Sequence, residues 1–300
     1  MANDEPDVGG RARGLNDTLA DRLIAADVLA TLFGREAPPV TIGRFRVLRS
    51  LGAGAMGTVW LCRDDELARE VAVKLLRGRS GDARADARMV REARALARLT
   101  HPNVVVVHEV GTTERGVFVA MEHVRGATLR RWLESPRTVA EILAVFVQAG
   151  RGLAAAHRVK IVHRDFKPEN VLIGDGTGDE ARARVVDFGL ARTDGLETGN
   201  GEVRDSTDGS LSLTHAGALL GTPAYMAPEQ LEGAAADARS DQFAFCVALF
   251  EALHGARPFV GDNVPALLVA IRGGAPHAGL RGVSPRVRAA IERGLAAVPA

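Results

Sequence analysis

The chain has 300 residues, and its 38 Lys and Arg residues nearly balance 37 Asp and Glu residues, for a formal net charge of +1. This length exceeds that of a usual single hydrophobic core, so we expect one two-lobed domain with a tail, or two small domains. The balanced charge argues against a nucleic-acid-binding protein that works through bulk positive charge.

The cysteines and the N-terminus bear on the compartment in which the protein works. Cys62 and Cys246 lie in apolar segments without the spacing of a zinc or redox pair, so we expect core thiols and a reducing, cytoplasmic location. Residues 1–7 are acidic and lack the basic-then-apolar order of a signal peptide. No uninterrupted apolar run reaches about 18 residues, which predicts no membrane span within this sequence.

The first predicted element is a short amphipathic helix in an otherwise polar N-terminal tail. Thr18 and Asp21 form a loose capping box, and Gly34 provides a stop. One face of the helix carries Leu19, Leu23, Ala26 and Ala30. Two interpretations remain open. The helix is either an extension packed on the following domain or a docking or autoregulatory element.

A glycine-rich loop follows between two predicted strands, residues 45–51 and 58–62. Its sequence is Gly52-Ala53-Gly54-Ala55-Met56-Gly57. The spacing also matches the dinucleotide-binding fingerprint, which alone is weak evidence. A dinucleotide fold needs a helix that starts within the glycines, whereas Thr58-Val59-Trp60-Leu61 favours a strand. We therefore expect a hairpin whose glycines let backbone N–H groups approach phosphates.

A buried cation is predicted on the third strand, Val71-Ala72-Val73-Lys74. A lysine among apolar residues is costly unless it is paired. The matching anion is Glu92 on the next predicted helix, residues 87–99, where it shares the side of the apolar stripe. The alternative for Glu92 is a solvated helix charge.

Further elements lead to the large second half of the chain. Residues 104–110 and 116–124 predict two strands, and residues 139–158 predict a long helix. A second apolar helix is expected over residues 241–253. Asp241 opens it, which is typical of an N-cap. The resemblance to a known family described below implies a second role that is compatible with the first, as a buried brace for the catalytic loop.

One cluster of polar residues carries the chemistry. Its two parts are His163-Arg164-Asp165-Phe166-Lys167-Pro168-Glu169-Asn170 and Asp187-Phe188-Gly189. A strand after Asn170 and a second strand before Asp187 would form a hairpin, and both residues would then lie together at its open end. Phosphoryl transfer needs a carboxylate for the substrate hydroxyl, a cation for the moving phosphate, and oxygen ligands for Mg²⁺. Asp165, Lys167, Asn170 and Asp187 supply that set, although a polar loop between strands is the simpler alternative.

These motifs, in this order, resemble the protein kinase superfamily, and residues 45–300 are similar to bacterial eukaryotic-type serine/threonine kinases. The resemblance implies an α+β, bilobal fold: a polar tail with one helix (1–43), a small antiparallel β lobe with one helix (44–124), and a mainly helical lobe (125–300) that ends before the last helix. It also implies transfer of the γ-phosphoryl group of ATP to Ser or Thr of protein substrates, with Mg²⁺ or alternatively Mn²⁺.

The resemblance assigns roles to individual residues. Asp165 orients the hydroxyl and accepts its proton, Lys167 neutralises the phosphoryl group, and Asn170 and Asp187 hold the metal. Lys74, clamped by Glu92, positions the other phosphates. The implied ATP-binding residues are Leu51, Gly52, Ala53, Gly54, Ala55, Met56, Gly57, Thr58, Val59, Ala72, Lys74, Glu92, Met121, Glu122, Val124 and Leu172. Among these, Met121 is the gatekeeper, and Glu122 and Val124 offer backbone groups to adenine.

The remaining implied roles concern regulation. Arg164 is expected to pair with a phosphate on the segment between 187 and 229, with Thr214 nearest the family's modified position; otherwise Arg164 bonds backbone carbonyls. Thr222 and Lys167 follow the serine/threonine pattern, and autophosphorylation would use a transient dimer. In relatives, Glu229 pairs with an Arg in the last helices. Either this sequence ends before that Arg, or another Arg such as Arg286 or Arg288 substitutes for it.

Two rival functions remain at this stage. A pseudokinase scaffold would keep the fold without turnover, but every expected catalytic position is filled. A nucleotide-binding oxidoreductase is disfavoured by the strand predicted after Gly57.

Overall fold

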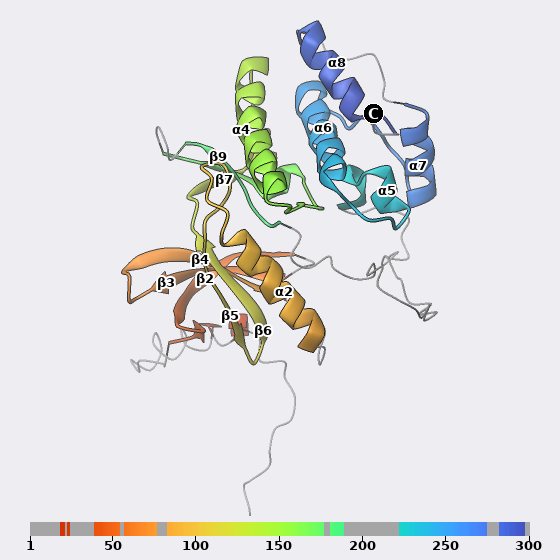
Figure 1. Cartoon of the computed structure of the whole chain (residues 1–300). Helices are drawn as coiled ribbons and strands as arrows, with labels where there is room; N and C mark the ends of the chain where they lie inside the picture. Colours follow the sequence, from red (N-terminus) through yellow and green to blue (C-terminus); the bar gives the residue numbers. More distant parts are fainter. Residues whose placement is uncertain are drawn as a thin grey trace, which may run out of the picture.

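The computed structural model describes residues 19–21, 23–24, 39–54, 57–76, 83–176, 181–188, 222–274 and 282–297. These residues form a sheet-rich lobe with one long helix and a second, mainly helical lobe (Figure 1). The expected α+β, bilobal architecture is confirmed.

The small lobe is built on a six-stranded antiparallel sheet with the order β1-β2-β3-β4-β6-β5. The strands are β1 (Thr41–Ile42), β2 (Phe45–Gly54), β3 (Gly57–Asp64), β4 (Arg69–Leu76), β5 (Val107–Thr113) and β6 (Gly116–Glu122). A strand begins at Gly57, as the β-branched residues predict, so the glycine segment joins two strands and the dinucleotide-type helix is excluded. The register pairs Val59 with Lys74, which brings the glycine hairpin next to the predicted phosphate-binding lysine.

Helix α2 (Ala83–Leu96) covers one face of this sheet. Met89, Ala93 and Leu96 are buried against the core, as the predicted apolar stripe requires.

The opposite face of the sheet carries a second hydrophobic cluster. Its strand residues are Phe45, Val47, Trp60, Cys62, Val71, Val73, Phe118 and Ala120. Leu19 joins this cluster with only 5% of its surface exposed, and Leu23 packs beside it. The described part of the predicted N-terminal helix therefore lies on the sheet, which favours the packed-extension interpretation. The remainder of that helix is outside the described residues.

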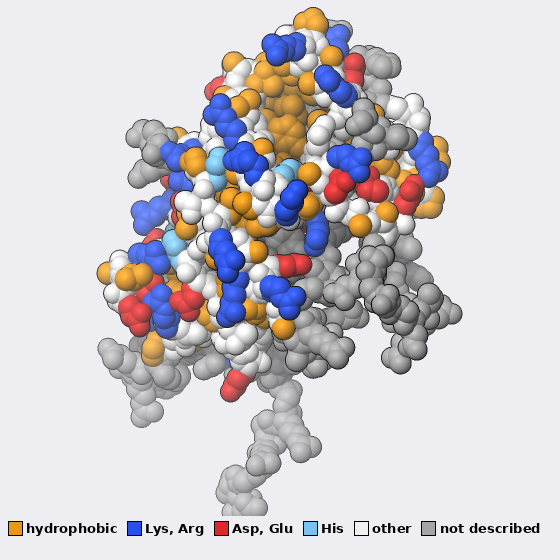
Figure 2. All heavy atoms as spheres, in the orientation of Figure 1, with side chains coloured by type: hydrophobic (Ala, Val, Ile, Leu, Met, Phe, Trp, Pro, Cys, Tyr) orange, Lys and Arg blue, Asp and Glu red, His pale blue; other side chains and the backbone are white. Residues whose placement is uncertain are grey.

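The large lobe begins with a short strand after the hinge between the lobes. The strands of this lobe are β7 (Gly126–Thr128), β8 (Val171–Gly174) and β9 (Ala183–Val185). Its helices are α3 (Leu129–Trp132), α4 (Val139–Arg158), α5 (Pro228–Leu231), α6 (Ala238–His254), α7 (Val264–Arg272) and α8 (Pro285–Gly294). Two 3-10 turns, η1 (Pro168–Asn170) and η2 (Thr222–Tyr225), complete it. The three strands form a small sheet in the order β7-β8-β9. In Figure 2, apolar side chains follow the hollow between α4 and α6, the two helices joined by the edge-on contact of Phe146 with Phe245.

Helix α4 has the bounds that the sequence predicts. A full capping box between Thr138 and Glu141 starts it, and Ile142, Phe146 and Leu153 are buried. By length and composition alone, α4 is also apolar enough to cross a membrane, which the search for uninterrupted apolar runs overlooked. Its packing against α6 and β9 is the arrangement of a core helix.

Both cysteines are core thiols, as expected. Cys62 and Cys246 are buried, and burial raises the pKa of each to about 12.

The buried position of Leu19 yields a stability prediction. Replacing Leu19 with Asp should lower the free energy of unfolding by about 2 kcal/mol or more, because a charge would enter the apolar cluster over the sheet. Leu19→Met, which keeps the volume, should cost less than about 1.5 kcal/mol. Urea unfolding measures both, and an unchanged midpoint for Leu19→Asp would show that the helix does not cover the sheet.

Candidate active site

A buried carboxylate from α6 holds the loop that carries Asp165. Asp241 is 1% exposed, and its two oxygens accept hydrogen bonds from the backbone N–H groups of His163 (2.7 Å) and Arg164 (2.8 Å). The ring of His157 also bonds Asp241, at 2.7 Å. The N-cap of α6 is Asp237, so the interpretation of Asp241 as an N-cap is wrong. Asp241 instead braces the backbone of the catalytic loop.

Three predicted catalytic residues converge within this loop. Lys167 Nζ lies 2.8 Å from Asp165 Oδ2, and Asn170 Nδ2 donates to the Asp165 backbone oxygen at 2.8 Å and to Oδ2 at 3.3 Å. Asp165 and Asn170 are each only 6% exposed. The carboxylate is thus oriented by a cation and an amide before any substrate arrives.

Two residues of the site adopt backbone conformations that side chains rarely tolerate. Arg164 has φ 64° and Asp187 has φ 60°, both in the left-handed region. Between them lies the fully buried ring of His163, which contacts the rings of Phe166 and Phe188 and bonds the Val186 carbonyl at 2.9 Å. The surrounding packing therefore fixes both strained residues.

The two predicted metal ligands are brought together by the β8–β9 hairpin. Val186 N–H donates to the Asn170 carbonyl at 2.9 Å, which places Asp187 directly beside Asn170. One carboxylate and one amide are hard oxygen ligands that suit Mg²⁺ when substrate phosphates and water complete the shell. Among the described residues, no group of three or more Asp, Glu, His or Cys side chains is arranged to hold a metal ion.

The predicted phosphate-binding lysine differs from expectation in its partner. Lys74 is 6% exposed, and its Nζ lies 2.9 Å from Asp187 Oδ2. Glu92 Oε1 instead lies 3.9 Å from Arg164. Among the described residues, the expected Lys74–Glu92 ion pair is not formed, because the buried lysine takes Asp187 as its anion.

The other predicted nucleotide residues lie on strands of both lobes. Val59, Ala72 and Met121 come from strands of the small lobe, and Leu172 comes from β8 below them. Gly57 has φ 139°, and a Cβ there would lie 2.2 Å from the Leu75 carbonyl, so the hairpin needs glycine at this position. Predicted residues on β2 are Leu51, Gly52, Ala53 and Gly54, while Ala55 and Met56 lie outside the described residues.

The regulatory predictions are only partly visible. Thr222 begins η2, and Gln230 donates to the Arg164 carbonyl at 2.9 Å, which ties α5 to the catalytic loop. Thr214 and the polar segment 195–213 lie outside the described residues.

One charged cluster beside the catalytic loop was not predicted. Arg130 on α3 pairs with Glu169 at 2.9 Å and with Glu251 at 3.2 Å, and it also contacts the hydroxyl of Tyr225, which donates to Glu251 at 2.6 Å. Burial alone would lower the pKa of Arg130, but the hydrogen bonds to Glu251 and Glu169 outweigh it and raise the pKa. The cluster joins α3, the catalytic loop, η2 and α6. The feature of the sequence that could have indicated this cluster was the charged residue Glu169, between Lys167 and Asn170.

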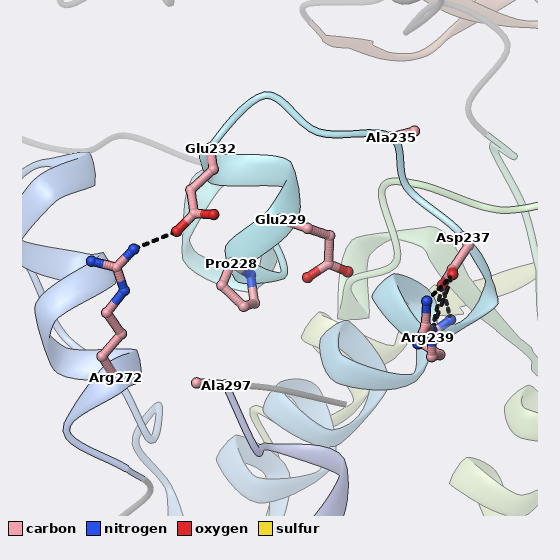
Figure 3. Close-up of a pocket in the computed structure, with 8 residues that line it drawn as sticks. All are labelled: Pro228, Glu229, Glu232, Ala235, Asp237, Arg239, Arg272 and Ala297. Carbon is pink, nitrogen blue, oxygen red and sulfur yellow. Dashed lines mark hydrogen bonds and ion pairs between the residues drawn. The ribbon is translucent and has the colours of Figure 1, made fainter. Parts of the chain in front are cut away.

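Glu229 has a different partner from the one expected. It accepts a hydrogen bond from Ser240 Oγ at 2.5 Å and faces a cavity of about 440 Å³ (Figure 3). Two arginines line this cavity, but Arg239 pairs with Asp237 and Arg272 pairs with Glu232. Among the described residues, neither Arg286 nor Arg288 pairs with Glu229, so that substitution is wrong.

Comparison with known proteins identifies the family. The family model described as "Protein kinase domain" matches residues 45–273, which is most of the chain. The chain belongs to the protein kinase family.

The relatives of this kinase are bacterial serine/threonine-protein kinases. Pkn3 of Myxococcus xanthus is 38% identical over 73% of the chain, and PrkC of Bacillus subtilis is 36% identical over 75%. The matched regions cover 39% and 32% of those relatives, so the chain spans roughly a third to two fifths of their length. The crystal structure of the Mycobacterium tuberculosis PknI kinase domain is similar, with a TM-score of 0.63, 26% identity, and coverage of 88% of this chain and 92% of that one.

Buried histidine in the site predicts how stability depends on pH. Burial lowers the pKa of His163 below its usual 6.5, and burial also lowers the pKa of His101 and His108. Below pH 6.5 the unfolded chain therefore binds more protons than the folded kinase, and stability is lost as the pH falls.

Between about pH 7.5 and 5.5, the melting temperature should fall, with up to about 1.4 kcal/mol lost per pH unit from the buried His163. His101 and His108 are more exposed, so their contributions should be smaller. His108→Gln should flatten this dependence relative to the parent protein. A melting temperature that rises on acidification would contradict the prediction.

Proposed function

We propose that this kinase domain transfers the γ-phosphoryl group of ATP to Ser or Thr hydroxyls of proteins. The observation that carries the proposal is the convergence of Asp165, Lys167, Asn170 and Asp187 at one hairpin mouth, with Lys74 directly opposite. Lys167 and Thr222 follow the pattern of serine/threonine enzymes, and the related bacterial proteins are named serine/threonine-protein kinases.

Positioning and electrostatics supply most of the rate enhancement in such a site. Asp165 orients the incoming hydroxyl and accepts its proton, and Lys167, 2.8 Å away, offsets the charge on the transferred group. Lys74 contacts the remaining phosphates. Mg²⁺, or alternatively Mn²⁺, would be held by Asn170 and Asp187 and would screen the phosphate charge when bound.

The two rival functions differ in what they require of the site. A pseudokinase would share the fold but transfer no phosphate, and the filled catalytic positions favour turnover. An oxidoreductase would need a helix at the glycine loop, where the structure has strand β3.

Single substitutions test the activity directly. Lys74→Met and Asp165→Asn should each reduce the incorporation of labelled γ-phosphate into a generic basic protein by about 100-fold or more, because each removes a group with a direct role in the proposed reaction. The melting temperature should change by only a few degrees. Turnover above a few per cent of the parent rate in either variant would overturn the assigned roles, and an inactive parent that binds ATP would indicate a pseudokinase.

We further propose a cytoplasmic enzyme that activates itself in a transient dimer. Arg164 beside Asp165 would pair with a phosphate on the activation segment, between Asp187 and Glu229, because a partly buried guanidinium is stabilised by an anion. Thr214 is the proposed acceptor, with Ser206, Thr207, Ser210 and Ser212 as alternatives.

Mass spectrometry of protein made with ATP should detect phosphate on Thr214. Thr214→Ala should lower the rate by about tenfold or more, in line with the roughly 1 to 3 kcal/mol that such coupling carries. An unmodified Thr214 together with a fully active Thr214→Ala variant would refute this site.

A further inference from the structure

An ion pair joins β6 of the small lobe to β9 of the large lobe. Glu122 is the last residue of β6, and Arg184 is the middle residue of β9. Arg184 Nε lies 3.0 Å from Glu122 Oε1, and their side chains are only 14% and 28% exposed. The pair therefore links the six-stranded sheet to the small sheet of the large lobe, largely away from water.

Both partners lie next to residues proposed to bind nucleotide. Glu122 follows the buried Met121 and would present its backbone carbonyl to adenine. Arg184 pairs in register with Leu172, the proposed floor of the adenine site, and is followed after Val185 and Val186 by the metal ligand Asp187. This one side-chain contact thus helps to set the distance from the hinge at Glu122 to Leu172 and to the strand that leads to Asp187.

The pair is not needed to form either strand. Val185 donates to the Asn103 carbonyl at 2.9 Å and accepts from Val105 N–H at 3.0 Å, so β9 is fixed through its own backbone. On the other side, Glu122 N–H donates to the Val106 carbonyl at 2.8 Å. Loss of the Arg184 side chain should leave both strands in place and release only the contact between them.

The environment makes this contact stronger than an ordinary surface pair. Exposed ion pairs contribute little because water and salt screen them, whereas removal of one partner from a mostly buried pair leaves the other charge uncompensated. The uncompensated Glu122 carboxylate would then turn toward water, and this contact would no longer hold the hinge at a fixed distance from β9.

We propose that Arg184 is a positioning residue for nucleotide: by holding Glu122, it fixes the hinge backbone at the correct distance above Leu172. The inference rests on the proposed kinase function only for where adenine binds. It predicts an effect on ATP affinity that is separate from protein-substrate binding and from phosphate transfer.

The test compares variants of the pair in nucleotide binding and in kinetics. Titration with a fluorescent ATP analogue should show an increase of about fivefold or more in the Kd of Arg184→Gln, with a parallel increase in KM for ATP. The KM for a peptide substrate should stay within about twofold of the parent value. Glu122→Gln, which removes the pair from its other end, should have the same effect.

Conservative and reversed variants distinguish positioning from general damage. Arg184→Lys should recover part of the affinity, and the double variant Glu122→Arg/Arg184→Glu should bind better than either reversed single variant. Arg272→Gln is the matched control, because it breaks the exposed Arg272–Glu232 pair of the large lobe and should leave Kd unchanged.

The outcomes separate this inference from the proposed function. An unchanged Kd in both Arg184→Gln and Glu122→Gln overturns the positioning role, as does an equal loss in Kd, peptide KM and melting temperature. A parent protein that binds the analogue but transfers no phosphate refutes the kinase activity alone, and one that binds no nucleotide refutes both.

Discussion

The catalytic loop depends on one buried carboxylate. Asp241 is almost completely removed from water, and a charge in that position is tolerable only when hydrogen bonds satisfy it. Its donors are the backbone N–H groups of His163 and Arg164 and the ring of His157. Because the donors are main-chain groups, α6 fixes the path of the loop itself, including the left-handed conformation of Arg164, and so determines where Asp165 points.

Charged contacts between separate elements complete the site around this loop. Lys74 of the small lobe reaches Asp187 of the large lobe, and Arg184 reaches back to Glu122. Both contacts join residues of the two lobes at positions with little exposure, where electrostatic interactions are stronger than at the surface. The two lobes are therefore held together by these ion pairs as well as by the hydrophobic core that they share.

Local patterns were sufficient to predict much of this arrangement. The bounds of α4 follow from its helical period, and the strand at Gly57 follows from the β-branched residues after it. The catalytic residues are close in sequence, so their spacing alone brings them together. The buried role of Asp241 came from family resemblance, and only the structure distinguished it from an N-cap.

The partners of charged residues were not predictable in the same way. Arg130 meets Glu251 across 121 residues, and Glu229 bonds Ser240 where an arginine was expected. Lys74 could satisfy its charge with either of two carboxylates, and sequence spacing does not rank them. Such choices depend on distances between elements that pack only in the tertiary structure.

The apolar face beneath Leu19 has a practical consequence for where this protein can be divided. The family match starts at Phe45, yet Phe45, Trp60 and Phe118 belong to the cluster that Leu19 and Val40 help to cover. A shortened protein that begins at Phe45 would present this face to solvent, and a contiguous apolar surface of that kind promotes self-association. The cooperative folding unit therefore begins upstream of Phe45, the residue at which the family match starts.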